Sequence, residues 1–371
     1  MKKTILHIIY NLGRGGAETL LVTVVKELSD YNNIIVTLFP ENHFVDELKC
    51  DKYYCLNLSS IFKLPFSSNR LKKIIKENNV DLVHSHLFWP TVLARMGTPK
   101  NIPLITTIHA FIATSIEYKK WYIRLLDRIT YKLHKNIIVT VAKGALDEYF
   151  NFLKVKRYRA YALHTFVDVK IFNNTNACAK KESQTFRLVT VGALRKQKNH
   201  AYLLEAFKLL DNKKFQLDIY GEGPLHDSLD AVIKENSLNV NLKGEVKNIQ
   251  SVLNKYDLYV MSSTFEGFSL SVLEAMAMRI PLLLTDIRSF REQCENTATY
   301  FNLNDVKDFT AMLEMLSSDK NNLHRLGDAG HNRAVNNFTL EQHMQGLRKI
   351  YSEVLAKIGR ASCRERVYSS V

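Results

Sequence analysis

Glu266 and Glu274 stand eight positions apart, with Gly267 and the start of an apolar helical pattern between them. Helix-forming residues begin at about Leu270. We therefore expect Glu266 in the loop before a helix and Glu274 one to two turns inside that helix. Each carboxylate could accept two hydrogen bonds from hydroxyl groups.

The same helix offers a place for an anion between the two carboxylates. The backbone N–H groups of Phe268, Ser269 and Leu270 should be free at the helix N-terminus, where partial positive charge favours a phosphate. A pyrophosphate with a polyol on either side, which is the layout of a nucleotide sugar, would fit. The spacing alone also allows a simpler interpretation, with one glutamate in a loop and one on a helix surface.

The residues that fill this spacing carry more information than the spacing itself. Residues 266–277 read EGFSLSVLEAMA. They resemble the signature of the retaining, family 4 nucleotide-sugar glycosyltransferases, and the resemblance covers almost the whole chain. It implies an α/β GT-B fold, with two Rossmann-like domains facing a central cleft. It also implies that Glu274 holds the ribose hydroxyls and that Glu266 holds the hydroxyls of the transferred sugar.

A glycine-rich segment follows the first expected strand. Gly15 and Gly16 precede Glu18 at the start of a helical pattern, and glycines there let backbone amides approach an anion closely. The segment lacks the spacing of a dinucleotide fingerprint, and a simple tight turn remains an alternative. The resemblance identifies it with the family's G-G-x-E element, which faces the donor phosphates and the acceptor.

Histidines end two of the expected strands. His84 and His86 end one, and His109 ends another. A structural role is possible for each, and a metal site at His84 and His86 is disfavoured because no Asp or Glu is nearby in the sequence. In the family, a histidine at the position of His109 lies beside the transferred sugar, so we assign His109 to the chemistry together with Glu266.

A basic loop follows the first strand of the second half. Lys198 would start a helix near the cleft and suits pairing with a diphosphate, although solvated loop lysines are equally common. The family usually has Arg where this chain has Ala193, and Arg195 is a candidate substitute. A second departure is Arg279, where the family commonly has Gly; we expect Arg to disfavour positive φ there.

Short β-branched runs alternate with helical patterns along all 371 residues, which indicates two parallel α/β domains. The expected strands are 5–10, 33–39, 82–85, 104–108, 136–140, 186–191, 216–220, 240–242, 258–261 and 281–284. The expected domains are 1–168 for the acceptor and 169–338 for the nucleotide sugar, with a helix at 339–357 crossing back. Residues 358–371 resemble a translated sequencing adapter, and we expect them to be a non-native tail.

The net charge is +14 and it is concentrated in the N-terminal half, where residues 1–165 hold 24 Lys and Arg against 13 Asp and Glu. Such a field attracts anionic partners. Five cysteines without a C-x-x-C pair indicate a reduced, cytoplasmic protein without structural zinc. We expect peripheral association with the inner face of the plasma membrane.

The segment 119–135 contributes to this basic character. Apolar residues gather on one side of the helical pattern (Trp121, Tyr122, Leu125, Leu126, Ile129 and Leu133), and cations run along another (Lys120, Arg124, Arg128, Lys132 and Lys135). The pattern allows a core-packed helix with a solvated basic face. It also allows an interfacial helix beside anionic lipid.

Taken with the resemblance, these features predict a retaining hexosyltransferase of cell-surface polysaccharide biosynthesis. Its partners would be a nucleotide sugar, UDP-linked in preference to GDP-linked, and a glycan or lipid-linked acceptor. No cofactor is expected, and no metal, since no D-x-D motif is present. A non-catalytic nucleotide- or glycan-binding protein and a GT-B epimerase or phosphorylase are the alternatives. No basic–aromatic module indicates nucleic-acid binding.

Overall fold

The computed structural model describes residues 2–13, 15–113, 115, 117–172 and 185–368, with side chains described as far as Ala356. The chain divides into two compact units, which we call the first domain (Met1–His164 with His343–Val371) and the second domain (Thr165–Gln342). The expected domain limits, at 168/169 and 338/339, stay predictions. The expected non-native tail at 358–371 also stays a prediction, because it extends beyond the described residues.

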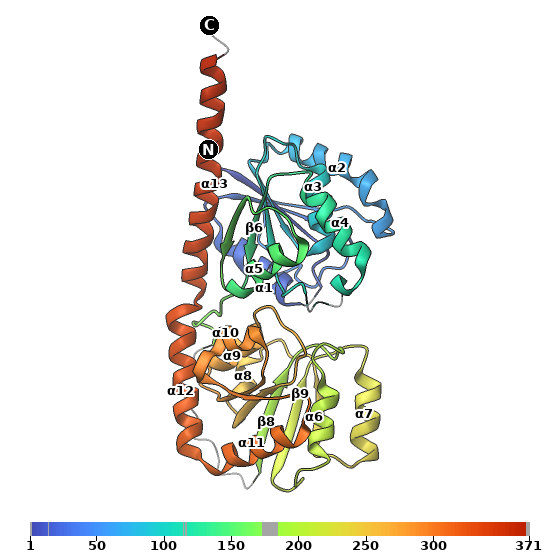
Figure 1. The fold of residues 1–371 in the computed structure, drawn as a ribbon, viewed down its shortest axis with the longest axis vertical. Coiled ribbons are helices and arrows are strands. Elements are labelled where there is room, and N and C mark those ends of the chain that lie inside the picture. Colours follow the sequence, from blue (N-terminus) through green and yellow to red (C-terminus); the bar gives the residue numbers. More distant parts are fainter. Residues whose placement is uncertain (1, 14, 114, 116, 173–184, 369–371) are drawn as a thin grey trace. The chain divides into compact units, whose positions relative to one another are not determined.

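The first domain contains a seven-stranded parallel sheet with the order β3-β2-β1-β4-β5-β6-β7. Its strands are β1 (Thr4–Ile9), β2 (Asn32–Thr37), β3 (Lys52–Cys55), β4 (Leu82–His86), β5 (Leu104–Ile108), β6 (Asn136–Thr140) and β7 (Arg159–Ala162). Its helices are α1 (Gly16–Glu27), α2 (Leu64–Glu77), α3 (Phe88–Gly97), α4 (Trp121–Tyr131), α5 (Lys143–Leu153) and most of α13 (Leu340–Tyr368). Helices α2, α3 and α4 lie on one side of the sheet and α13 on the other (Figure 1).

The second domain contains a six-stranded parallel sheet with the order β10-β9-β8-β11-β12-β13. Its strands are β8 (Phe186–Val191), β9 (Phe215–Tyr220), β10 (Val240–Gly244), β11 (Leu258–Met261), β12 (Leu282–Thr285) and β13 (Thr299–Phe301). Its helices are α6 (His200–Phe207), α7 (His226–Glu235), α8 (Gln250–Leu253), α9 (Leu270–Ala277), α10 (Arg288–Cys294), α11 (Val306–Ser318) and α12 (Lys320–Asn337).

Both sheets have the doubly wound arrangement, in which the chain starts in the middle and builds outward on both sides. In the first sheet β1 lies between β2 and β4, and in the second β8 lies between β9 and β11. The loops that follow these central strands meet where the strand order reverses, which is the usual ligand site of such folds. The expected α/β class with two Rossmann-like domains is confirmed.

All ten expected strands are present, but β3, β7 and β13 were not predicted. These three are edge strands of three or four residues. The side chains of β3 and β7 are partly or fully exposed, so their sequences show no continuous apolar run. Several helices, including α2, α3, α5 and α12, were also not named in advance.

The core-packed interpretation of the segment 119–135 is wrong. Trp121, Tyr122, Leu125, Ile129 and Leu133 are all exposed, and only Leu126 of the apolar set is partly buried. Helix α4 instead turns Ile123, Asp127, Thr130 and Tyr131 inward. Among the helices in the described part of the chain, none has the length and apolar character needed to cross a bilayer.

The helix end at Arg279 also differs from expectation, because this residue does adopt a positive φ of +58°. Its guanidinium pairs with Asp328 at 2.6 Å, and its carbonyl group faces α12 at Gly327. A Cβ atom on Gly327 would lie 2.3 Å from the Arg279 carbonyl oxygen, so a side chain cannot fit there. The close approach of α9 and α12 therefore depends on glycine at this position.

We predict that Gly327→Ala lowers the free energy of unfolding by about 1–3 kcal/mol, because the backbone must move to admit the methyl group. Gly330→Ala on the same helix is the matched control. Its Cβ would meet Met276 at an ordinary 3.8 Å, so the helix propensity of alanine should leave stability unchanged or raise it by up to about 1 kcal/mol. Urea unfolding of both variants tests this, and equal effects would contradict it.

Candidate active site

Two loops join at the carboxyl ends of the central strands of the second domain. One follows β8 and runs from Gly192 to Asn199; the other follows β11 and contains Ser262 to Ser269. The Thr264 N–H donates to the Gln197 carbonyl at 2.9 Å, and the Gln197 side-chain amide donates to the Phe265 carbonyl at 2.9 Å. These bonds fix the two loops to each other and position the charged side chains that they carry.

Lys198 and Glu266 form an ion pair at this junction. The Lys198 ammonium donates to Glu266 Oε1 at 2.7 Å, and the Ser263 hydroxyl donates to the same oxygen at 2.7 Å. Both side chains are largely withdrawn from solvent, so the pairing is stronger than at a free surface. The structure thus brings together the two charges that the sequence assigned to neighbouring parts of a sugar diphosphate.

The sequence predicted that Lys198 starts helix α6. The helix instead begins at His200. The residue between them, Asn199, adopts a left-handed conformation with φ +54°. This turn leaves Lys198 in the loop. Its side chain passes over Gly192, where a Cβ atom would lie 2.9 Å from Lys198 Cε.

The N-terminus of α9 differs from expectation at the amide of Ser269. Helix α9 begins at Leu270, as predicted, but the Ser269 N–H donates to the buried side chain of Gln293 at 2.9 Å. The Gln293 amide group donates back to the Ser269 carbonyl at 2.8 Å. Ser269 is therefore a structural anchor of this turn, and the assignment of its amide to an anion is wrong.

Glu274 lies inside α9, in a different environment from Glu266. Its side chain is only partly exposed, and desolvation raises the pKa of its carboxyl group to about 7. A carboxyl group that titrates near neutral pH can lose its proton when hydroxyl donors arrive, because two hydrogen bonds stabilise the charged form. Such a carboxyl group is suited to accept hydrogen bonds from two neighbouring hydroxyl groups.

Two further features of the second domain lie near the loop that follows β8. The glycine turn after β9 packs closely against the loop after β8. Gly221 has φ +138°, and a Cβ atom at this position would overlap the Gly192 carbonyl, so the close packing requires glycine. Arg195 is exposed, and within the described residues its side chain has no hydrogen bond or ion pair. The structure therefore does not bring Arg195 into the Lys198–Glu266 pair.

In the first domain, the glycine-rich segment leads into α1 as predicted. Gly15 is the N-cap of α1, Gly16 is its first residue, and Glu18 lies in its first turn. The Glu18 carboxylate folds back over Gly15, where a Cβ atom would lie 2.4 Å from Glu18 Oε2. Glycine at position 15 thus makes room for the acidic side chain beside the start of the helix.

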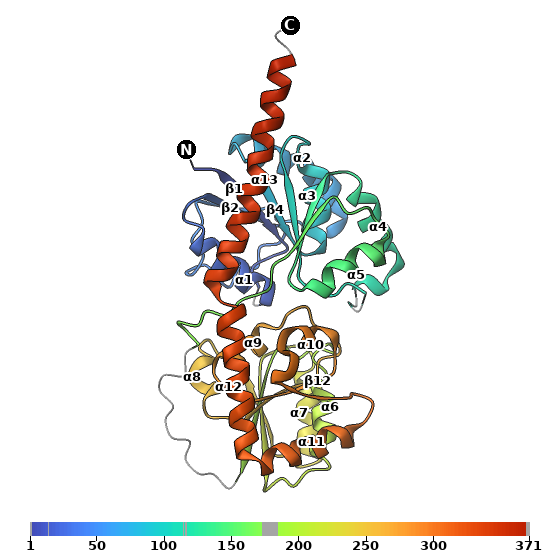
Figure 2. The same cartoon turned by 60° about the vertical axis from the view of Figure 1, so that its left-hand side comes forward.

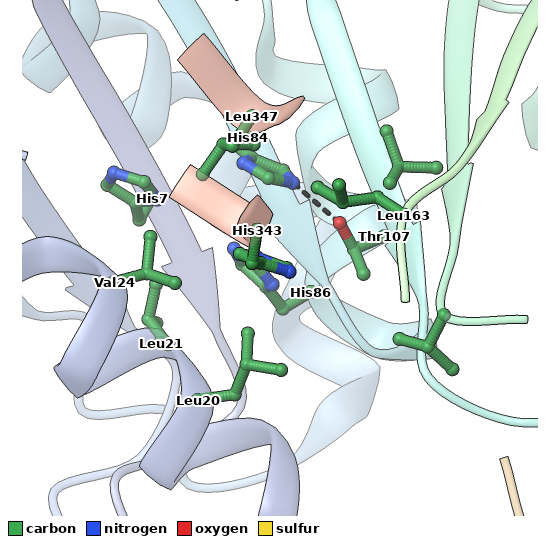
Figure 3. A pocket seen from close by; sticks show the side chains of 12 residues that line it. His7, Leu20, Leu21, Val24, His84, His86, Thr107, Leu163, His343 and Leu347 are labelled. Atoms are coloured by element: carbon green, nitrogen blue, oxygen red, sulfur yellow. Dashed lines mark hydrogen bonds between the residues drawn. The ribbon is translucent and has the colours of Figure 1, made fainter. Parts of the chain in front are cut away.

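His109 follows β5 and contacts His86, one of the buried histidines that Figure 3 shows with His7, His84 and His343. His109 Nε2 and His86 Nδ1 lie 3.2 Å apart and share a hydrogen bond whose donor depends on the tautomers. Next to them, His84 lies 2.7 Å from the Thr107 hydroxyl and 2.6 Å from the Tyr351 hydroxyl. Burial, with a smaller contribution from His343, lowers the pKa of His109 to about 4, so the ring is neutral at physiological pH.

A cavity of about 20 Å³ lies beside these rings, between apolar side chains of α1 and α13. His7 Nδ1 and His86 Nε2 are buried and have no hydrogen-bond partner. The ligand atoms of His7, His84 and His86 lie within 4.8 Å of one another, so these rings are the group that could hold a metal among the described residues. Both nitrogens of His84 already pair with hydroxyl groups, however, and the cavity has room for no more than a single water molecule.

Several positioning residues were missed by the sequence reasoning. Gln293 lies 24 positions from its partner Ser269, and Ser263 lies three positions from Glu266. His7 stacks on His86, which is 79 positions away. Ser263 lies only three positions before Glu266, and this short separation was a usable signal. Gln293 and His7 carried none, because only the folded sheet brings them to the site.

Comparison with known proteins agrees with this architecture. Residues 14–171 match the family described as Glycosyltransferase Family 4, and residues 174–333 match Glycosyl transferases group 1. Two doubly wound parallel domains with these sequences define a glycosyltransferase of the GT-B fold. The chain belongs to the family 4 glycosyltransferases, enzymes that move a glycosyl group from a donor to an acceptor.

Among similar proteins is the N-acetylgalactosamine-N,N'-diacetylbacillosaminyl-diphospho-undecaprenol 4-alpha-N-acetylgalactosaminyltransferase of Campylobacter jejuni, 26% identical over 332 residues (84% of this chain and 90% of the relative). The UDP-Gal:alpha-D-GlcNAc-diphosphoundecaprenol alpha-1,3-galactosyltransferase of Escherichia coli is 24% identical over 328 residues (81% and 82%). HepE of Anabaena, solved with UDP and glucose, shares the fold with a TM-score of 0.82 and 14% identity, covering 95% of this chain and 100% of HepE.

The buried histidines predict acid sensitivity. Burial lowers the pKa of His7 from 6.5 to about 4, so between these values the unfolded chain binds a proton that the folded chain does not. The contribution of His7 to the free energy of unfolding is therefore fully present above pH 6.5, and it is lost as the pH falls towards 4. For His7 alone, lowering the pH from 7.5 to 5 should remove about 2 kcal/mol.

Thermal unfolding at the two pH values measures this loss. His7→Gln should reduce the difference between pH 7.5 and pH 5, whatever its effect at pH 7.5. His43→Gln, at an exposed histidine of the same domain, should leave the difference unchanged. An identical acid response in wild type and His7→Gln would show that His7 is already protonated or solvated in the folded protein.

Proposed function

We propose that this glycosyltransferase moves a hexose-type sugar from a nucleotide sugar, UDP-linked in preference to GDP-linked, to a glycan or lipid-linked acceptor of cell-surface polysaccharide biosynthesis. The observation that carries the proposal is the Lys198–Glu266 pair beside the N-terminus of α9. The names of the two relatives support the acceptor class, since both include a sugar on an undecaprenol diphosphate.

The donor would be held by charges and dipoles of the second domain. Glu274 would accept hydrogen bonds from the ribose hydroxyls, and Glu266 from hydroxyls of the transferred sugar. Lys198 would divide its charge between Glu266 and the diphosphate, helped by the amides of Phe268 and Leu270. Because this set supplies positive charge from the protein itself, the proposal includes no metal ion and no cofactor.

The transfer step follows from these roles. An acceptor hydroxyl oxygen would form a bond to the anomeric carbon while the bond from that carbon to the diphosphate oxygen breaks. The diphosphate would leave with the bonding electrons, and it would take up the proton of the acceptor hydroxyl. Departure and attack on the same face would retain the anomeric configuration. Stabilising the charge on the departing diphosphate is the largest contribution that Lys198 could make.

His109 and the first turn of α1 are the groups of the first domain to which we assign roles in binding. A neutral His109, held by its hydrogen bond to His86, would bind sugar hydroxyls without opposing the positive charge that develops on the sugar ring. Gly15, Gly16 and Glu18 would contact the phosphates and the acceptor. The basic character of residues 1–165 supports the proposal that the enzyme acts at the cytoplasmic face of the plasma membrane, where a lipid-linked acceptor would lie.

Nucleotide binding tests the donor site first. UDP at about one hundred times its Kd should stabilise the protein by roughly 2.7 kcal/mol, which corresponds to several degrees in Tm. The shift should persist in EDTA, exceed that with GDP or ADP, and disappear in Glu274→Ala. Glu235→Ala, at an exposed glutamate of the same domain, is the control. The absence of any shift at millimolar nucleotide would refute the donor site, and binding without consumption of any UDP-sugar would indicate a non-catalytic protein.

The raised pKa of Glu274 predicts how this binding depends on pH. Ribose hydroxyls donate to the charged carboxylate, so UDP affinity should fall as the pH drops below about 7, where the free carboxyl group takes up a proton. Titration calorimetry between pH 5.5 and 8.5 should show release of a fraction of a proton on binding near pH 7. Glu274→Gln should bind weakly at every pH and lose this proton release; a wild-type affinity independent of pH would remove the assigned role.

A further inference from the structure

Helix α4 is amphipathic, but its large apolar side chains face solvent and not the core of the domain. Trp121 is 66% exposed, Ile129 is 53% exposed and Leu125 is 46% exposed. These three residues follow one another at intervals of four, so they form a single stripe along the helix. Tyr122 and Leu133 extend the stripe on its flank and are also exposed.

The buried side of the same helix carries a charge. Asp127 is 2% exposed and pairs with the equally buried Arg95 of α3. Tyr118 and Tyr149 donate hydrogen bonds to the Asp127 carboxylate. The Arg95 guanidinium also donates to the hydroxyl oxygen of Thr130 at 3.1 Å, to the side-chain carbonyl of Asn136 at 3.1 Å and to the hydroxyl oxygen of Tyr149 at 2.9 Å.

This network fixes the rotation of α4 about its axis. Turning the helix to bury Trp121 and Ile129 would withdraw Asp127 from Arg95 and leave a buried cation without its partner, which is strongly destabilising. The apolar stripe therefore remains at the surface of the folded first domain. In two views α4 lies at the outer edge of that domain, away from α13 (Figures 1 and 2).

Cations surround the stripe. The exposed basic residues on and next to α4 are Lys119, Lys120, Arg124, Arg128, Lys132 and Lys135. An apolar stripe with Trp and Tyr at one end, bordered by cations, is the composition of a helix that lies in the headgroup region of a membrane. We propose that α4 is the surface by which this protein docks onto an anionic lipid bilayer, an inference that deepens the proposed function and rests on its lipid-linked acceptor.

A second copy of the chain fits this surface less well. A twofold contact through α4 would set Arg124, Arg128 and Lys132 of one copy against the same cations of the other. The first domain as a whole offers no compensation, since 24 basic residues face 13 acidic ones in residues 1–165. Charge complementarity therefore selects an anionic partner.

Co-sedimentation with lipid vesicles tests the proposal. The full chain should bind vesicles of phosphatidylglycerol and phosphatidylcholine, and should bind pure phosphatidylcholine at least tenfold more weakly. Arg124→Gln with Arg128→Gln should weaken binding to the anionic vesicles by about thirtyfold, about fivefold for each charge, and raised salt should act in the same direction. Leu125→Ser with Ile129→Ser should weaken it by at least tenfold through lost apolar insertion.

Two controls separate this surface from the rest of the molecule. Leu209→Ser with Met315→Ser removes comparably exposed apolar side chains from the second domain and should leave vesicle binding unchanged. The UDP-induced rise in Tm, measured on every variant, reports the donor site independently. If UDP did not raise the Tm of the wild type, the proposed function would be refuted, while the membrane result would still stand.

Three results would overturn the proposal: equal binding to both kinds of vesicle, no vesicle binding by the wild type, or no effect of the α4 substitutions. Light scattering on the free protein identifies the competing occupant. A wild-type dimer that Leu125→Ser with Ile129→Ser converts to a monomer would assign the stripe to a second copy of the chain.

Discussion

Parallel pairing of the strands is the constraint on which the candidate site depends. In a parallel sheet every strand ends at the same edge, so loops from distant parts of the sequence must gather there. In the second domain this places Lys198, after β8, next to Glu266, after β11, although 68 positions separate them. In the first domain it places His86, at the end of β4, against His109, just after β5. Both pairs join neighbouring strands, β8 with β11 and β4 with β5.

The junction of the two loops explains why small residues recur in the second domain. Gly221 and Gly223 let the turn after β9 approach the loop after β8 more closely than side chains would allow, and Gly192 leaves space beside that loop. The space gained is taken by the stem of Lys198, whose ammonium reaches Glu266. Ser269 and Gln293 fix the entry to α9 in a similar way, by exchanging two hydrogen bonds. The acidic and basic groups are thus held by backbone geometry, and the side chains need little adjustment to keep their positions.

The sequence predicted those parts of the structure that depend on local pattern. Short runs rich in β-branched and apolar residues, such as 104–108 and 186–191, have the same limits as β5 and β8, because such residues favour buried strands. The spacing of Glu266 and Glu274 correctly predicted one in a loop and one inside α9. Prediction failed where distant residues decide the outcome. Gln293 takes an amide of Ser269 that looked free, Asp328 and Gly327 accommodate Arg279 with a positive φ, and Arg95 turns the apolar side of α4 outward. Each depends on a tertiary partner that no local pattern records.

The first domain is built from two separate segments of the chain, and this sets the order in which the two domains can fold during synthesis. Its core includes residues from near both ends of the chain: Tyr351 is fully buried and bonds to His84, and His343 and Leu347 line the same cavity as His7. The second domain is one continuous stretch, Thr165–Gln342. Because domains fold as units while synthesis proceeds from the N-terminus, the second domain has all its residues before the first does. The half of the enzyme that is made first is therefore the half that is finished last, and until then its strands lack the helix that covers them.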